Sequence, residues 1–383
     1  MALTVIRLDN VTTENGQRLK NLLAGLPHLQ ETPHEVFDGA EAFLEQMKTP
    51  EQFKGRRVLF CVALDDTGTN DDLMDVLRSI RRQKTAFDRS LLALIIDTAG
   101  DLYSKSSACG IALAINNAGG AILGGPLVEA TGSLKNFKIR AMNYNMSLEN
   151  AYAFAADRLV RRLLEEPLRG EASPDHSKLT EKLEKPEEID AFPPHRRLLC
   201  LHTNHTESSN TFSLWQMVKA ALPHYIEVAE ISLENEVIHD CRGCSYDVCH
   251  SMGKRTECFF HDIVDTTIYP ALEEADALIM LCANRNDALA ANLTAFINRL
   301  TAIFRKRELF SDKKLFAIIV SGYSGSDIIE KQLIAALGMN KTFSIPPHFA
   351  LAVTANAPGE IFEVEGIEEL AGRYASHVAG MLW

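Results

Sequence analysis

The chain has 383 residues and a formal net charge of −12 at pH 7, and this length is enough for two domains with separate cores. The negative charge argues against nucleic acid or an anionic membrane surface as a partner, because both are bound mainly by Lys and Arg, and no apolar run is long enough to cross a membrane. The first residues, MALTVIRLDN, lack the features of a signal peptide, so we expect a cytoplasmic protein in which disulfides are rare.

The first half of the chain, residues 1–164, alternates apolar runs with amphipathic segments. Its clearest strand patterns are VLFCVALDD (58–66) and LLALIIDTAG (91–100), which are apolar enough for strands buried on both faces. Strands that alternate with helices predict a parallel sheet covered by helices on both sides. Residues 165–195 are polar, charged and contain proline, which is typical of a linker between domains.

The second half, residues 196–383, repeats this alternation. Its pattern predicts strands at 196–203, 225–233, 277–283, 314–322 and 348–355, and helices at 210–222, 290–304, 326–338 and 368–382. Three segments match in the same order in both halves: 21–32 with 217–228, 58–66 with 278–287, and 91–100 with 315–325. The ordered matches favour a duplicated α/β unit over two unrelated units that share the residue types of buried strands.

Four of the eight cysteines lie in residues 241–258, CRGCSYDVCHSMGKRTEC, in a stretch that only the second half has. One compact run suits the four thiolates of an iron–sulfur cluster, whereas structural zinc usually takes two separated C-x2-C pairs. Zinc, and cysteines that pack as small hydrophobic residues, remain open alternatives. His250 and His261 are substitute ligands in principle. We predict a cluster, most simply [4Fe–4S], held by Cys241, Cys244, Cys249 and Cys258.

The residues from Cys241 onward carry a resemblance to a known family. The compact cysteine run, the acidic segment HDI (261–263) and the helix LTAFINR (293–299) resemble the NAD(P)H-dependent FMN reductase family, and most closely its iron–sulfur flavoproteins. The resemblance covers residues 196–330 well and the rest of the second half loosely. It implies an α/β fold of two tandem flavodoxin-like domains, each a doubly wound parallel sheet, of which the first is a degenerate copy.

The resemblance also implies where FMN binds, namely in three loops at the carboxyl ends of strands in the second half. The loop 202–212 would hold the phosphate at a helix N-terminus, although its Ser-Asn-Thr could equally be a plain helix cap. This loop lacks the glycine and arginine of the family, and the next loop lacks the family's Pro-Val-Tyr, whereas SGYSG (321–325) is better preserved. The predicted FMN residues are His202, Thr203, Asn204, Ser209, Asn210, Thr211, Ala283, Asn284, Arg285, Asn286, Ser321, Gly322, Tyr323 and Gly325.

The first half carries no comparable site. Its loops 8–17 and 63–72 are rich in acidic residues, which would repel a phosphate, so we expect no flavin there. We predict instead that residues 1–164 act as a built-in partner of residues 196–383 in a pseudo-twofold pair. Whole chains can still form homo-oligomers through other faces.

The sequence therefore predicts an oxidoreductase that uses FMN and an iron–sulfur cluster, with NAD(P)H as a candidate donor. It would pass electrons between a two-electron donor or acceptor and a one-electron carrier, such as a ferredoxin-like protein. No catalytic side chain is indicated, because the sequence shows no Ser-His-Asp set, paired-carboxylate motif or P-loop. The alternative is a non-catalytic tandem flavodoxin-like scaffold or assembly subunit with eroded cofactor sites.

Overall fold

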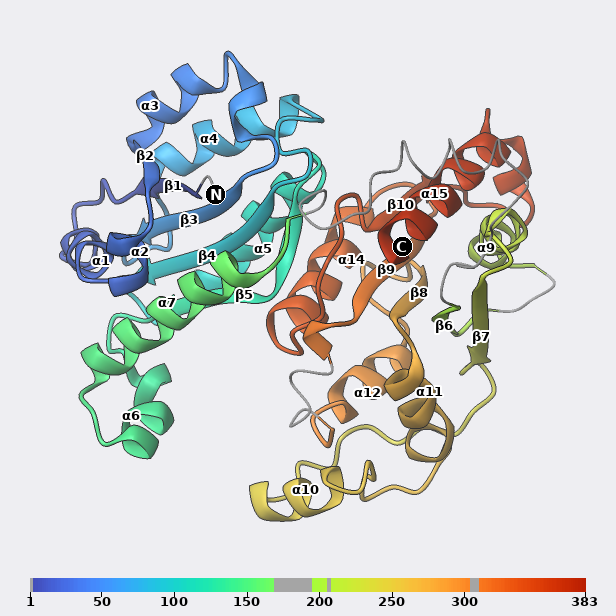
Figure 1. The fold of residues 1–383 in the computed structure, drawn as a ribbon. Coiled ribbons are helices and arrows are strands. Elements are labelled where there is room, and N and C mark those ends of the chain that lie inside the picture. The colour runs from blue at the N-terminus through green and yellow to red at the C-terminus, as the bar shows by residue number, and fades with distance from the viewer. Residues whose placement is uncertain (1–2, 169–194, 205–207, 304–309) are drawn as a thin grey trace, which may run out of the picture. The chain divides into compact units, whose positions relative to one another are not determined.

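The structure is a computed structural model that describes residues 3–168, 195–204, 208–303 and 310–383. The chain divides into two compact units, Met1–Glu184 and Lys185–Trp383, and each is described by itself (Figure 1). Most of the predicted linker, 165–195, lies outside the described residues. In the described ranges, no helix is both long and apolar enough to cross a membrane.

The first unit is built on one parallel sheet with the strand order β2-β1-β3-β4-β5. Its strands are β1 (Leu3–Leu8), β2 (His34–Asp38), β3 (Arg57–Leu64), β4 (Leu91–Thr98) and β5 (Ala121–Ala130). Its helices are α1 (Asn15–Ala24), α2 (Pro27–Glu31), α3 (Gly39–Gln46), α4 (Asp71–Arg82), α5 (Ser104–Asn116), α6 (Lys138–Tyr144) and α7 (Leu148–Glu165), with short turns η1 (Pro50–Phe53) and η2 (Lys135–Phe137).

The second unit has a parallel sheet of the same design, with the order β7-β6-β8-β9-β10. Its strands are β6 (Arg196–His202), β7 (Ile226–Ser232), β8 (Ala277–Ala283), β9 (Lys314–Ser321) and β10 (Ala350–Thr354). Its helices are α9 (Asn210–Ala221), α10 (Tyr246–Gly253), α11 (Tyr269–Glu274), α12 (Ala291–Arg299), α14 (Ser326–Leu333) and α15 (Ile367–Leu382), with η3 (Val264–Ile268), η4 (Ile334–Met339) and η5 (Glu360–Glu363).

Both sheets have the flavodoxin-like strand order, in which the second strand lies at one edge and the first strand lies next to the third. This confirms the predicted fold class of two tandem doubly wound α/β domains. The continuous apolar runs became central strands because both of their faces are covered: every residue of β3 and β4 is buried. One predicted helix, 290–304, ends earlier, since α12 stops at Arg299.

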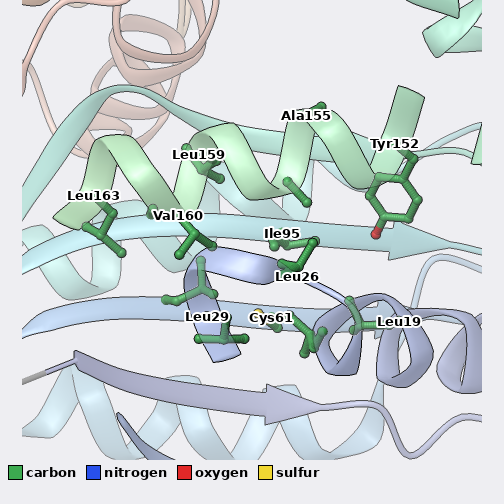
Figure 2. Packing of buried hydrophobic residues seen from close by; sticks show 14 of the residues in the cluster. Leu19, Leu26, Leu29, Cys61, Ile95, Tyr152, Ala155, Leu159, Val160 and Leu163 are labelled. Atoms are coloured by element: carbon green, nitrogen blue, oxygen red, sulfur yellow. The ribbon is translucent and has the colours of Figure 1, made fainter. Parts of the chain in front are cut away.

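The core of the first unit explains why its helices lie where they do. In Figure 2, the apolar face of α7, with Leu159 and Leu163, packs over α2 and the strands that carry Cys61 and Ile95. Each leucine buried in this way contributes on the order of 2 kcal/mol of hydrophobic free energy. The second unit has a matching core in which α9 and α15 cover one face of its sheet.

Candidate functional site

The strand order of the second unit reverses between β6 and β8. The chain segments that follow these two strands therefore diverge at the carboxyl edge of the sheet, and open α/β folds bind their ligands at such a point. The segment after β9, the neighbour of β8, reaches the same edge. The structure thus brings the three predicted FMN loops to one edge.

His202, the last residue of β6, is buried, and its surroundings do not suit the predicted role in binding the phosphate. Its Nδ1 accepts a hydrogen bond from the backbone N–H of Asn204 at 3.4 Å, and its Nε2 lies 4.0 Å from a carboxylate oxygen of Glu230. Burial lowers the pKa of His202, and the Glu230 carboxylate opposes this shift. A neutral imidazole offers no positive charge to a ligand. His205, in the same loop, lies outside the described residues.

Asn204 is the residue of this loop that fits an anion best. Its side chain is buried, with 1% of the residue exposed, and its Nδ2 has no hydrogen-bond partner among the described residues. A buried donor without an acceptor costs about 1–3 kcal/mol, so buried polar groups are normally paired. Thr203, half-buried, directly precedes it. The loop therefore has a vacant donor where the phosphate of FMN is predicted to bind.

The side chains of Ser209 and Asn210 form hydrogen bonds within the protein itself. Ser209 caps α9 by accepting a hydrogen bond from the N–H of Phe212 at 3.2 Å. Asn210 donates to the carbonyl oxygen of Ala357 and accepts from the N–H of Gly359, and Thr211 is buried. The helix-cap interpretation thus accounts for Ser209, and an anion would be left with the backbone N–H groups of the first turn.

The loop after β8 is tied to the loop after β9 through Asn284. Its amide donates to Ser321 Oγ at 3.2 Å and to the carbonyl oxygen of Ser324 at 3.0 Å, and its Oδ1 accepts from the N–H of Asp287. Ala283, at the end of β8, is half-buried, whereas Arg285 and Asn286 are exposed at the edge. Arg285 is therefore a side chain that is free to cover a planar ligand there.

The glycines of the SGYSG segment (321–325) are required by contacts within the protein itself. Gly325 has a φ of +90°, and a Cβ on it would lie 2.1 Å from an oxygen of Asp287. A Cβ on Gly322 would lie 2.7 Å from Asn356 Oδ1. Both glycines are thus in close contact with other residues of the protein, although they were predicted as contacts of FMN. Ser321 is buried and hydrogen-bonds Ser326.

Tyr323 is the aromatic residue that this edge presents to a ligand. It is 81% exposed, and its hydroxyl accepts a hydrogen bond from Asn356 Nδ2 at 2.9 Å. The hydrogen bond fixes one end of the ring while most of its apolar surface stays open. Such a ring can stack on a flat aromatic ligand.

The cysteine segment joins β7 to β8 and is partly helical, since Cys249 lies on α10. Its thiols are free, with Cys241 exposed and the other three half-buried. Burial raises the pKa of Cys249, and the neighbouring thiols of Cys241, Cys258 and Cys244 raise it further. In the described part of the chain, however, no three His, Cys, Asp or Glu side chains are arranged to hold a metal ion. In this structure the four predicted ligands are therefore not arranged as a metal site.

Two residues that the sequence analysis did not single out contact the cysteine segment, namely Asn298 and Arg299 of α12. Arg299 is 1% exposed. An arginine next to the apolar stretch of LTAFINR was the available signal, because arginine is rarely buried without specific partners.

The corresponding edge of the first unit is filled by its own side chains. Arg18 forms two hydrogen bonds with the buried carboxylate of Asp97 and also donates to the carbonyl oxygens of Thr131 and Gly132. Burial raises the pKa of Asp97, and Arg18 opposes this shift. The absence of flavin from the first unit stays a prediction, and this occupied edge is a physical argument for it.

Comparisons with known proteins give distant structural neighbours and one family. No curated protein matches the chain. An FMN-dependent NADH-azoreductase from Bacillus anthracis is 11% identical and aligns over 48% of this chain and 100% of its own, with a TM-score of 0.35. An NAD(P)H:quinone oxidoreductase from Methanothermobacter marburgensis is 12% identical over 48% of this chain and 95% of its own, with a TM-score of 0.37.

The family comparison concerns the second unit. Residues 196–356, from the start of β6 to just beyond β10, match the model of the NADPH-dependent FMN reductase family, and this confirms for the second unit the resemblance seen in its sequence.

Proposed function

We propose that the chain is an FMN-dependent oxidoreductase with one FMN at the carboxyl edge of the second sheet. The observation that carries this proposal is the buried Asn204 Nδ2, which has no partner among the described residues and lies at the point where the strand order reverses. The match of residues 196–356 to a family of FMN reductases supports it. The name of that family makes NADPH the first donor to test.

The residues at this edge divide the work of holding the cofactor. Asn204 and the first-turn N–H groups of α9 would bind the phosphate, and neutral His202 would hold the Asn204 backbone by accepting its N–H. Tyr323 and Arg285 would lie along the ring system. FMN, when bound, supplies hydride and single-electron chemistry. The role of the protein is then to orient the cofactor and exclude water.

The proposal extends to Cys241, Cys244, Cys249 and Cys258 as ligands of an iron–sulfur cluster. The four thiols are free and lie around Cys249, and the cations Arg299 and Lys341 lie beside them. To ligate a cluster, the thiols would close in from their positions in this structure. A cluster exchanges single electrons, which would suit a one-electron carrier of ferredoxin type as partner.

Analysis of flavin, iron and sulfide in protein purified without oxygen tests this function. We expect one FMN per chain, and an Asn204→Ala variant should bind FMN about tenfold or more weakly because a charge-assisted hydrogen bond is lost. An Asp9→Ala variant, in the corresponding loop of the first unit, is the matched control and should bind FMN normally. Replacing each of the four cysteines by Ser should lower iron and sulfide without loss of FMN.

The result that contradicts the flavin site is a colourless chain in the presence of saturating FMN, or two FMN per chain. Zinc in place of iron would contradict the cluster and leave the flavin site intact.

A scaffold without cofactors is the second candidate. The observation in its favour is that Ser209, Asn210, Gly322 and Gly325 each have a role within the protein's own packing or hydrogen bonding. A chain that binds neither flavin nor metal, but folds normally, would favour this candidate.

A further inference from the structure

The insertion between β7 and β8 is held along its length by α12. At the start of α12, Asn292 Nδ2 donates to the carbonyl oxygens of Leu233 at 2.6 Å and Glu236 at 3.2 Å. Leu233 is the first residue after β7. The insertion is therefore attached to α12 where it leaves the sheet, before the cysteines begin.

The last turn of α12 holds the first cysteine through Asp240. Asn298 Nδ2 donates to Asp240 Oδ1 at 2.9 Å, and the same oxygen accepts the backbone N–H of Cys241 at 2.7 Å. Asn292 and Arg299 are seven residues, or about two helical turns, apart and so share one face of α12, whereas the side chain of Asn298 lies about 120° around the helix from that of Asn292. The insertion therefore contacts more than one face of α12.

Arg299 holds the other end of the cysteine run. Its Nη1 donates to both carboxylate oxygens of Asp262, at 2.7 and 2.5 Å, and its Nη2 donates to the carbonyl oxygen of Phe260 at 2.9 Å. Burial opposes the charge, but Asp262 and the nearby thiol of Cys258 raise the pKa of Arg299. Its Nε is buried and has no hydrogen-bond partner in the described residues. The contacts of Arg299 with Phe260 and Asp262 therefore fix the chain directly after Cys258.

Helix α10, in the cysteine segment, packs against the residues that directly follow α12. A Cβ on Gly253, at the end of α10, would lie 1.6 Å from the carbonyl oxygen of Ala302. Lys341 Nζ donates to Thr301 Oγ1 at 2.8 Å, and its ammonium is close enough to interact with the thiols of Cys241 and Cys249. Figure 1 shows α10 outside the layered part of the unit, on the side of α11 and α12.

We propose that α12 fixes the cysteines as ligands, with Asn298 positioning Cys241 through Asp240, and Arg299 positioning Cys258 through its hydrogen bonds with Phe260 and Asp262. The inference rests on the proposed metal role of the cysteines. Asn298 and Arg299 are positioning residues, because neither is itself a ligand. Partners of this kind set the orientation of a ligand, and their loss typically weakens metal binding 10–100-fold.

Hydrogen exchange of the full, reduced, metal-free chain tests the two contacts separately. Asn298→Ala should raise exchange at residues 239–241 about fivefold, as expected for one lost hydrogen bond, and leave residues 258–262 unchanged. Arg299→Lys keeps the charge but loses the planar fork, and should raise exchange at residues 258–262. Thr294→Ala, on an exposed part of the same helix, is the matched control and should change neither.

This pattern separates positioning from general destabilisation. Equal increases throughout the second unit, or no increase in either variant, would overturn the inference. Asn298 is exposed, so its variant should fold even if the variant of buried Arg299 does not.

Titration with Co²⁺, followed by the charge-transfer absorption of thiolate-bound cobalt, tests the functional consequence. Both variants should bind Co²⁺ about 10–100-fold more weakly than the wild type, and Thr294→Ala should bind it normally. Unchanged Co²⁺ affinity in both variants would contradict the inference. A wild type that binds no Co²⁺ would count against the proposed metal role, while the exchange pattern would still decide whether α12 positions the segment.

Discussion

At the scale of single residues, two buried donors mark the proposed sites. Asn204 Nδ2 lies in the loop after β6 and Arg299 lies on α12 close to Cys258, and neither Asn204 Nδ2 nor Arg299 Nε has a hydrogen-bond partner in the described residues. Proteins seldom leave buried donors unpaired. The proposed FMN site would supply the acceptor that Asn204 Nδ2 lacks, namely the phosphate of the cofactor.

His202 predicts a pH dependence for the second unit. Burial lowers its pKa below the ordinary value of 6.5, with Glu230 and Glu234 opposing and Lys219 contributing to the shift. Between the folded and unfolded pKa values the unfolded chain binds more protons, so stability is full above about pH 6.5 and is lost as the pH falls through this window. Protonation of Nδ1 would also remove the acceptor of the Asn204 N–H.

Thermal unfolding and FMN retention at about pH 5 and about pH 7.5 check this prediction. The wild type should lose stability and flavin at the lower pH, and His202→Asn should show a smaller difference between the two. His224→Asn, at an exposed position, is the control and should behave as the wild type. A His202 variant with the full wild-type pH dependence would show that another group titrates.

The sequence predicted which residues stand at the edge better than it predicted their contacts. Ser209 and Asn210 appear where the family pattern puts them, yet their side chains bind Phe212 and the loop before η5. Gly325 was predicted to contact the flavin, yet its positive φ and its closeness to Asp287 already require a glycine at this position. A residue type chosen for local geometry looks the same in a sequence as one chosen for a ligand.

At the scale of elements, the strands were predictable and the insertion was not. Continuous apolar runs specify buried parallel strands, and β8 spans the predicted residues 277–283. The cysteine segment has few apolar residues, so its sequence gave no periodicity from which α10 could be predicted. Its anchors on α12, Asn298 and Arg299, lie outside the segment and became visible only in three dimensions.

The path of the insertion along α12 determines how far the cysteines lie from the proposed FMN site. The insertion follows β7 and so begins at the carboxyl end of the sheet, where FMN is proposed to bind. Asn292, which binds Leu233, marks that end, but Arg299 lies seven residues further along α12, or about 10 Å at the helical rise of 1.5 Å per residue. The cysteines therefore gather near the far end of α12.

Gly253 makes the docking of α10 testable. Gly253→Ala would place a Cβ within 1.6 Å of the Ala302 carbonyl oxygen, and forced overpacking of this kind costs about 1–3 kcal/mol or displaces the element. We expect faster proteolysis within residues 241–258. Gly372→Ala is the matched control: nothing lies within 4 Å of its Cβ, and it is in α15, so it should stabilise the unit by about 0.4–1 kcal/mol. Proteolysis at the wild-type rate in Gly253→Ala would contradict the proposed seat of α10.

At the scale of the whole molecule, the two units have the same strand order but differ in the residues at the carboxyl edges of their sheets. Both sheets share the flavodoxin-like order, but Arg18 and Asp97 fill the edge of the first, whereas in the described part of the second Asn204 Nδ2 has no partner and the cysteine insertion is present. The common fold of the two units was predictable because matched strand patterns recur in the same order in the sequence. The filling of the first edge was not, because Arg18 and Asp97 are 79 positions apart in the sequence.

The sequence further predicts that the two units pair within one chain, the first serving as a wall for the flavin site of the second. A flavodoxin-like unit that lacks a cofactor is retained most simply for its shape, and an apolar pairing surface left uncovered is a liability. A linker of the length of residues 165–195 would span roughly 30 Å if it behaved as a coil, which is enough to bring a tethered copy into place at high effective concentration. Limited proteolysis between residues 165 and 195, followed by size exclusion, checks the pairing. We expect the halves to elute together with FMN bound; halves that separate while the second keeps its flavin would instead establish two independent domains.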